Sequence, residues 1–326
     1  NNQAGNISSF GATSTTITWS GSTSDFNGSS NEYIMYCFAN IDGYQRIGSY
    51  TGNGSAGGPF VYTGFEPAWL LIKRIDGGNS SWAIHDNKRA TSNPRNKELF
   101  ANLSDAENTF TAIDFLDNGF QIVNSNALYN NNGNTYLFLA IAANPDTTAP
   151  TKANSFKTVL YTGDDGTSRQ LTGMGFKPDF TWIKQRNAVD NHALFDSVRG
   201  VNLSLSSNLV NVTNDRNDDS TKGVTSFDND GVTLGSWNNV NANNDTYVAW
   251  NWKGLDHDRN LPAVNNDGSI ISSVSANIAA GFSIVSYKGN ATSGATVGHG
   301  LGGELDFLIV KSTNLTQAWN VYVKGV

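Results

Sequence analysis

The sequence of 326 residues is poor in charge, cysteine, proline and histidine, and each shortage excludes a class of protein. It has a single cysteine, so an intrachain disulfide framework is excluded. None of its 4 histidines has metal-ligand spacing to another histidine or to the cysteine. We therefore expect neither a metal site nor a cofactor.

Long apolar runs and blocks of positive charge are also missing. No segment approaches the roughly 18 consecutive apolar residues that a membrane-spanning helix needs. The formal net charge is -7 and no basic patch stands out, so nucleic acid and an inserted membrane are not expected partners. Nucleophile-elbow, phosphate-loop and dinucleotide motifs are absent as well, and we expect no enzyme activity.

What the sequence does contain is typical of β structure. Apolar runs of four to eight residues, rich in Val, Ile, Phe, Trp and Tyr, alternate with Asn- and Gly-rich turns. The pattern predicts an all-β protein built from tandem antiparallel β-sandwich modules. Jelly-roll and immunoglobulin-like topologies both fit the pattern.

A repeat divides the chain. Three Tyr-x-Gly segments begin at Tyr50, Tyr161 and Tyr287, and a lysine that ends an apolar run follows each of them at nearly the same spacing (Lys73, Lys184 and Lys311). Later landmarks keep the register in the first two copies, since Tyr136 follows Tyr50 at the same spacing as Tyr247 follows Tyr161. The repeat predicts six segments: the C-terminal part of a module (1–44), a complete module (45–144), a linker (145–157), a second complete module (158–254), a linker (255–282) and the N-terminal part of a module (283–326).

The two partial modules lead to a further expectation. An incomplete sandwich leaves open strand edges, which invite pairing. We expect the two end segments to complete one module together, either within the chain or across neighbouring subunits of an oligomer, unless they belong to a longer array.

Charged residues recur at fixed positions in the two complete copies. Asp86 and Arg89 correspond to Asp196 and Arg199, and one carboxylate beside a cation in each copy indicates ion pairs rather than the two facing carboxylates of a glycosidase. The third copy has Val323 in place of the aspartate.

Aromatic side chains are better ligand candidates, because sugar faces stack on aromatic rings and Asn-rich loops supply hydrogen bonds. The candidates for ligand contact are Trp82, His192, Trp237 and Trp319, with core packing as the alternative for each. His257, between Asp256 and Asp258, is interpreted as part of a solvated loop, and the acidic turns at 117–119 and 228–231 as hairpin turns rather than calcium ligands.

Three strings carry a resemblance to a known family: GFKPDFTWIKQR (175–186), HALFDSVRG (192–200) and YVAWNWK (247–253). They are similar to a repeat found in virion proteins of marine and cyanobacterial phages, which are described as tail-fibre-like structural proteins. Residues 36–39, 48–54 and 59–62 are similar to the next module type in the same proteins. The resemblance implies a virion location and, as partners, other copies of the chain, other virion proteins and a host surface glycan.

Three functions remain open from the sequence. The first is a phage virion structural or appendage protein that takes part in host attachment. The second is a carbohydrate-binding adhesin module of a bacterium. The third is a polysaccharide-degrading tailspike, for which the sequence shows no facing carboxylate pair.

Overall fold

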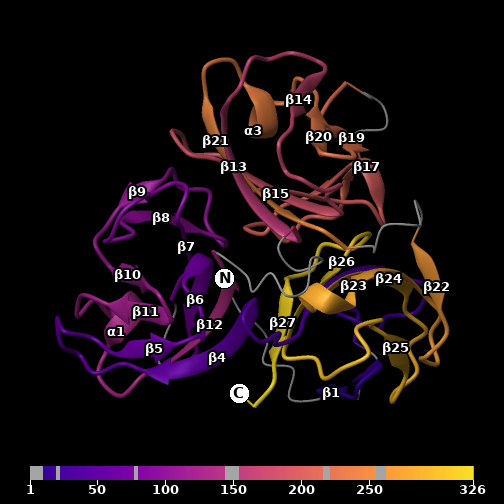
Figure 1. The fold of residues 1–326 in the computed structure, drawn as a ribbon. Helices are drawn as coiled ribbons and strands as arrows, with labels where there is room; N and C mark the ends of the chain where they lie inside the picture. Colours follow the sequence, from indigo (N-terminus) through magenta and orange to yellow (C-terminus); the bar gives the residue numbers. More distant parts are fainter. Residues whose placement is uncertain are drawn as a thin grey trace.

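The computed structural model describes residues 10–19, 23–76, 80–143, 154–215, 221–254 and 262–325. These residues form three β lobes around a common centre (Figure 1). Each lobe has one six-stranded and one three-stranded antiparallel sheet. The all-β, sandwich-like prediction is confirmed. Among the described residues, helix is limited to short turns: α1 (Ala127–Asn130), α3 (Asn238–Asn241) and a 3-10 turn at Ile278–Ala280.

The first module follows the chain from β4 to β12. Its six-stranded sheet has the order β4 (Gln45–Thr51), β12 (Thr135–Ala142), β6 (Pro67–Arg74), β7 (Ala83–Asp86), β8 (Lys97–Phe100) and β9 (Asn108–Thr109). Its three-stranded sheet has the order β10 (Ile113–Leu116), β11 (Gly119–Ile122) and β5 (Phe60–Tyr62). The turn at 117–119 joins β10 to β11, so it is a hairpin turn as expected.

The second module repeats this topology. Its large sheet has the order β13 (Phe156–Thr162), β21 (Thr246–Trp252), β15 (Phe180–Gln185), β16 (Ala193–Asp196), β17 (Gly200–Leu205) and β18 (Asn214–Asp215). Its small sheet has the order β14 (Arg169–Leu171), β20 (Gly231–Leu234) and β19 (Val224–Asp228). The turn at 228–231 closes the hairpin of β19 and β20.

The third module, which we call the split module, combines both ends of the chain. Its large sheet has the order β22 (Ala263–Asn265), β23 (Ser272–Asn277), β24 (Phe282–Lys288), β3 (Glu32–Phe38), β26 (Phe307–Ser312) and β27 (Asn320–Val323). Its small sheet contains β1 (Phe10–Ala12), β2 (Thr16–Trp19) and β25 (Thr296–Gly298). The expectation that the two partial modules complete each other is confirmed, and the pairing occurs within the chain.

The expected linker at 255–282 is wrong in its second half. Residues 263–265 and 272–277 form the hairpin of β22 and β23, which extends the large sheet of the split module. The segment is rich in serine and therefore looks polar, but Ser272, Val274 and Ser275 are buried against neighbouring strands. Residues 255–261, including His257, lie outside the described residues.

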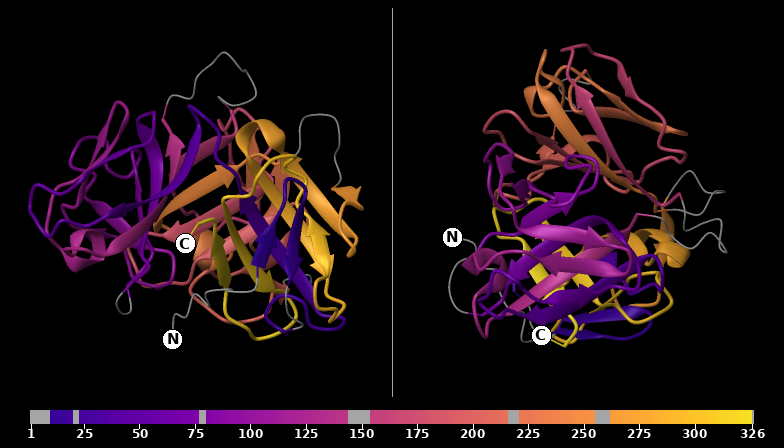
Figure 2. Two further views of the ribbon diagram at one scale, coloured as in Figure 1. Left: turned by 90° about the horizontal axis from the view of Figure 1, so that it is seen from below. Right: turned by 60° about the vertical axis from the view of Figure 1, so that its left-hand side comes forward.

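Alternation along the strands gives every large sheet two buried faces. In β12, Tyr136, Phe138 and Ala140 face the core between the two sheets of the first module. Leu137, Leu139 and Ile141 point the opposite way, into a core shared by all three modules. The other two modules follow the same scheme, with their own cores between large and small sheets. The three large sheets thus meet at the centre of the molecule, which Figure 2 shows from two further directions.

Candidate functional site

The shared core is dominated by aromatic rings from different modules. Trp69 of the first module lies edge-on to Trp252 of the second, with ring centroids 5.7 Å apart. Phe180 of the second module stacks on Tyr36 of the split module at 4.3 Å. These contacts bury large rings that no single module would cover, so the three modules are packed as one body.

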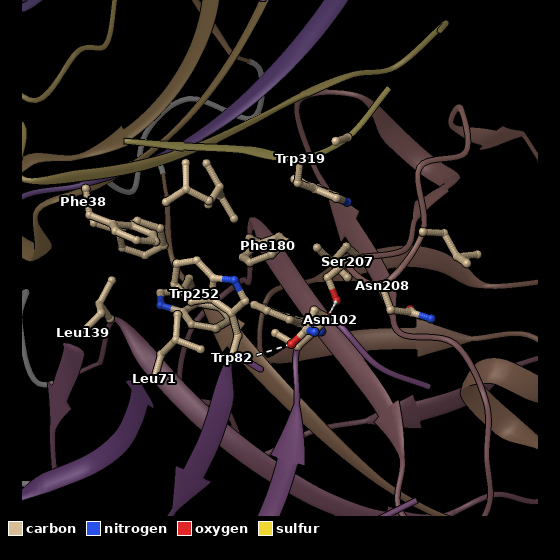
Figure 3. A pocket seen from close by; sticks show the side chains of 18 of the residues that line it. Phe38, Leu71, Trp82, Asn102, Leu139, Phe180, Ser207, Asn208, Trp252 and Trp319 are labelled. Carbon is tan, nitrogen blue, oxygen red and sulfur yellow. Dashed lines mark hydrogen bonds between the residues drawn. The ribbon is translucent and has the colours of Figure 1, made fainter. Parts of the chain in front are cut away.

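A cavity of about 120 Å³ opens within this core (Figure 3). All three modules contribute to its wall, which is mostly apolar: Phe38, Trp69, Leu71, Trp82, Ala101, Asn102, Leu139, Phe180, Trp182, Leu194, Ser207, Asn208, Leu209, Val210, Trp252, Phe307, Ile309, Ala318, Trp319 and Val321. The aromatic residues of its inner wall are almost fully buried, whereas Val210 is 44% exposed. The cavity therefore runs from the centre of the molecule toward solvent.

Polar groups hold the loops around the cavity in place. The backbone N–H of Trp82 donates to Oδ1 of Asn102 at 2.7 Å, as drawn in Figure 3. Ser207 donates through Oγ to the carbonyl of Ala101, which joins the second module to the first. Trp319 donates through Nε1 to the carbonyl of Ser206 at 2.9 Å and so joins the split module to the second.

Three buried donors that belong to residues lining the cavity have no hydrogen-bond partner among the described residues. They are Nε1 of Trp69, Nε1 of Trp252 and Nδ2 of Asn102. Trp69 and Trp252 are each only 2% exposed. Buried polar atoms normally find a partner, so these three donors are exceptions, as is Nε1 of Trp19 in the core of the split module.

The structure brings together two of the four predicted ligand residues. Trp82 and Trp319 both line the cavity, from the first and the split module. Trp237 lies elsewhere, edge-on to Phe195 in the core of the second module.

The prediction of an accessible ligand contact at His192 is wrong. Its side chain is fully buried, with Nδ1 accepting from Nε1 of Trp182 at 2.8 Å and Nε2 facing the carbonyl of Phe100 at 2.9 Å. Burial and the nearby Lys184 lower the pKa of His192 to about 3, so the ring is neutral and structural at ordinary pH. An apolar neighbourhood formed by another module cannot be read from the local sequence.

The two predicted ion pairs are present and lie where modules meet. Nε of Arg89 is 2.5 Å from Oδ2 of Asp86, which also accepts from Nε1 of Trp250 in the second module at 3.0 Å. Each aspartate ends a strand and accepts from the backbone N–H of its arginine. The positive charge of Arg89 and the hydrogen bonds keep the pKa of Asp86 low despite burial.

The second pair repeats the geometry one module further on. Nε of Arg199 is 2.6 Å from Oδ2 of Asp196, and this carboxylate accepts from the Tyr36 hydroxyl of the split module at 2.8 Å. Each pair therefore joins its own strand end to the next module.

The third junction explains why the third copy departs from the pattern. Val323 pairs with Phe307 in the split module, as Asp86 pairs with Trp69 in the first, so Val323 corresponds to Asp86. In the same way, Leu139 of β12 corresponds to Trp250 of β21. The leucine side chain has no N–H or O–H group to donate to a carboxylate, and the valine has no carboxylate that requires a donor. The change at 323 is therefore matched by an apolar residue at the corresponding position of the first module.

Each of the three repeated lysines donates a hydrogen bond to a backbone carbonyl at or beyond the end of its own strand. Lys184 and Lys311 are fully buried and donate to the carbonyls of Gln185 and Ser312, both at 2.7 Å. Burial lowers the pKa of each to about 8. Lys73, which is less buried, donates to the carbonyl of Ser80 at 2.5 Å. Gln185 and Ser312 are the last residues of β15 and β26, so these two lysines bond to the ends of their own strands, whereas Lys73 bonds to the loop after β6.

A buried polar chain in the first module has no counterpart in the repeat and was not predicted. Nδ1 of His85 faces the carbonyl of Arg95 at 2.9 Å and so carries the hydrogen, which leaves Nε2 to accept from the Tyr129 hydroxyl at 2.8 Å. The same hydroxyl contacts Oε2 of Glu98. The tyrosine hydroxyl thus lies between the imidazole and the carboxyl and links them in one buried chain of hydrogen bonds.

Burial shifts the pKa values of the two end groups in opposite directions. It raises the pKa of Glu98, although the hydrogen bonds from Tyr129 and Asn108 act against the rise. Burial together with Arg89 lowers the pKa of His85 to about 4. The second module has the apolar Phe195 and Val240 in place of His85 and Tyr129, and Ser204 in place of Glu98. The sequence signal was therefore the replacement of two apolar residues by polar ones in one copy.

No metal centre is visible in the part of the chain that the structure describes. Residues 10–19, 23–76, 80–143, 154–215, 221–254 and 262–325 contain no group of three His, Cys, Asp or Glu side chains placed to hold an ion. Cys37 is buried, and burial raises the pKa of its thiol to about 12. Among the described helices, none has both the length and the apolar character needed to cross a bilayer.

One family model matches residues 1–145 and 151–326, which is nearly the whole chain; its description is a domain of unknown function (DUF7483). The chain belongs to this family. Each matched stretch holds one complete module and one part of the split module, and the break lies between the first and second modules. Neither a curated protein nor a solved structure matches the chain.

Proposed function

We propose that this member of the DUF7483 family is a non-enzymatic structural protein of a phage virion appendage that takes part in host attachment. The observation that carries the proposal is the shared aromatic core, which joins three β modules into one body and brings loops of all three to one mouth. A body of this kind suits a component that must hold its shape while it presents a surface. The resemblance of the repeat strings to virion proteins supports the same proposal.

The location is tested with an antibody against the purified chain. Particles purified from a lysate of the strain that carries the gene are labelled and viewed by electron microscopy. We expect decoration at a fixed place on the particle. Label found only in the soluble fraction, with bare particles, would contradict the virion location.

A carbohydrate-binding adhesin is the second candidate, and the mouth of the cavity supports it. Trp82 and Trp319 are half-buried and line the cavity, and Asn208, also half-buried, lines it as well. Aromatic faces beside amide groups are the usual means of holding a sugar. Glycan binding is shared by the attachment and adhesin proposals, and the particle labelling separates them.

Glycan binding is tested on an array with the wild-type chain and with Trp82→Ala and Trp319→Ala. We expect binding that each substitution weakens at least tenfold. Tyr62→Ala is the matched control, since Tyr62 is 65% exposed on β5 and does not line the cavity. An array with no signal at millimolar ligand would refute the glycan partner.

A tailspike enzyme has the least support. Asp86 and Asp196 are fully buried and each is paired with an arginine, so neither carboxylate faces a space in which a sugar could lie. Cleavage of host polysaccharide that is lost in Asp86→Asn or Asp196→Asn, with the fold intact, would overturn the non-enzymatic proposal.

A further inference from the structure

The small sheet of the first module ends in an apolar edge that faces solvent. Strand β5 is the last strand of this sheet and consists of Phe60, Val61 and Tyr62. Val61 is buried, whereas Phe60 is 45% and Tyr62 is 65% exposed, so both rings project from the outer face of the sheet. Leu116, 37% exposed, lies two strands away in line with Tyr62. The three exposed side chains form an apolar patch at this edge.

The backbone of β5 leaves hydrogen-bonding groups unused at the same edge. The carbonyl of Pro59 and the N–H of Thr63 both bond to the hairpin of β10 and β11. Backbone groups alternate in direction along a strand, so those of Phe60 and Tyr62 point away from β11. No described residue forms a hydrogen bond with these outward groups. An unpaired edge of this kind accepts a further strand readily.

The equivalent edges of the other two modules lack this combination. In the second module, the strand registers place the polar Gln170 and Thr172 at the two positions of the exposed rings. In the split module, Val297 at the equivalent edge is already bridged to Ile270. Because the same sheet forms without the rings, the fold does not account for Phe60 and Tyr62.

Glycines support the two rings from below. A Cβ atom at Gly119 would lie 2.8 Å from Cζ of Phe60, so this ring covers the glycine backbone. A Cβ atom at Gly64 would lie 3.8 Å from Cζ of Tyr62. Rings that already rest on the sheet lose less conformational freedom when a partner covers them.

A second copy of the chain fits this edge, because β5 is complementary to itself. When two β5 strands pair antiparallel around a two-fold axis at Val61, Phe60 of each copy lies opposite Tyr62 of the other. The outward backbone groups of these residues then meet as hydrogen-bonded pairs. The four rings form cross-strand aromatic pairs on one face, which stabilise strand pairing.

Charge does not oppose this pairing. The chain has a formal net charge of -7, but β5 contains no charged residue. Asp114, on the same face, belongs to β10, two strands from the edge. Strands are spaced by about 4.8 Å, so Asp114 and its counterpart in the second copy would be roughly 24 Å apart. That is about three Debye lengths at physiological salt, and the repulsion is screened.

We propose that the β5 edge of the first module is a self-association surface, at which two copies of the chain join their small sheets into one continuous sheet. The contact is small, so the dimer is weak and forms only at high protein concentration. Copies held close together in an assembly reach such concentrations locally. At the low concentration used on a glycan array the chain is a monomer. The dimer does not depend on host attachment, and either proposal can fail without the other.

Sedimentation velocity at protein concentrations from micromolar to millimolar tests the proposal. We expect the wild type to shift from monomer to dimer, and the double variant Phe60→Lys, Tyr62→Lys to dimerise at least tenfold more weakly, because like charges then face each other. The double variant Gln170→Lys, Thr172→Lys is the matched control at the equivalent edge of the second module and should dimerise like wild type. A wild type that stays monomeric at millimolar concentration, or a dimer that the lysines on β5 do not weaken, overturns the proposal.

A charge swap tests the register of the two strands. In the double variant Phe60→Lys, Tyr62→Glu, each new ammonium group would lie opposite the carboxylate of the other copy. We expect dimerisation at least tenfold tighter than with both lysines. Thermal unfolding verifies the fold of each variant, which polar residues should not disturb, since the second module forms the same sheet with Gln170 and Thr172. No recovery in a folded variant would overturn the antiparallel pairing around Val61.

Discussion

The Asp-x-x-Arg pairs act between modules as well as within them. Asp196 is held by Arg199 on its own strand turn, but it also accepts the hydroxyl of Tyr36 from a strand of the split module. The corresponding Asp86 accepts from Trp250. A buried carboxylate that gains a third donor from a neighbouring module adds a directional hydrogen bond to the packing between the two modules.

We predict that Tyr36→Phe lowers the free energy of unfolding by about 1.5–3 kcal/mol, the usual range for a hydrogen bond to a charged group. The ring and its stacking on Phe180 are kept, so the change isolates the hydroxyl. Urea unfolding measures the difference. Tyr62→Phe, at an exposed tyrosine, is the control and should change stability by less than about 0.5 kcal/mol. A Tyr36→Phe variant as stable as this control would contradict the role given to the contact.

The buried chain of His85, Tyr129 and Glu98 predicts a pH effect. Because the folded-state pKa of Glu98 is raised above its ordinary value of 4.5, the folded state binds the proton more tightly than the unfolded state. The stability that this group contributes is fully present below pH 4.5 and is lost as the pH rises through the raised value. Glu98→Gln removes the titration and keeps both contacts, since the amide donates to Tyr129 and its oxygen accepts from Asn108.

We therefore expect Glu98→Gln to gain stability relative to wild type as the pH rises above 4.5, by at most about 1.4 kcal/mol per pH unit. Chemical unfolding between pH 4 and pH 8 gives the two curves. Glu32→Gln, at an exposed glutamate, is the control and its curve should run parallel to that of wild type. Parallel curves for Glu98→Gln as well would show that the carboxyl is not protonated in the chain.

At the scale of strands, the split module depends on pairing between distant parts of the sequence. Strand β3 lies between β24 and β26, and its Cys37 is opposite Ser283 on one side and Leu308 on the other. Cysteine and serine are nearly isosteric, and Ser283 is fully buried beside the Cys37 thiol. The register between β3 and β24 can thus be tested with an engineered disulfide bond.

We predict that Ser283→Cys forms a disulfide with Cys37 under oxidising conditions and that the bond raises the melting temperature, because it closes a long loop in the unfolded chain. Mass spectrometry of unreduced peptides identifies the bond. Ser312→Cys is the control: it is equally buried in β26 but lies opposite Tyr33, so it should stay reduced. A disulfide in the control and none in Ser283→Cys would refute the register.

The repeat made much of this fold predictable from the sequence. Equal spacing of the landmarks, including Tyr50 with Tyr136 and Tyr161 with Tyr247, indicated two whole modules, and the strand registers pair the tyrosines of each set directly. The hairpin of β22 and β23 could not be predicted in the same way. Its serine-rich sequence is typical of a linker, and the burial of Ser272 and Ser275 depends on neighbouring strands.

The site was less predictable, for a related reason. Trp82 and Trp319 were candidates because of their residue type, but the cavity that joins them forms only where three sheets meet. The faces of β6 and β15 that point away from the small sheet of their own module are apolar. The sequence therefore indicates that these faces are covered, but it does not identify the covering element. Apart from the repeated Asp-x-x-Arg pairs, module-to-module contacts carry no periodic signal, so the cavity appears only in three dimensions.

At the scale of the whole molecule, two kinds of core should respond differently to the same substitution. Phe180 lies in the shared core, where its ring contacts Tyr36, Trp252 and Phe282. Phe120 lies in the core between the two sheets of the first module, against Tyr50 and Phe138. Both side chains are at most 1% exposed, so Phe→Ala should cost about 3–5 kcal/mol at either position.

The two variants differ in which strands lose protection from amide hydrogen exchange. Phe180→Ala weakens the packing between modules, so amide hydrogen exchange should speed up in the large sheets of all three, including β6, β21 and β24. Phe120→Ala should speed up exchange mainly in β5, β10 and β11, because its cavity opens inside one module. Exchange confined to the second module in Phe180→Ala would mean that the modules are stable separately and that the shared core does not join them into one cooperative unit.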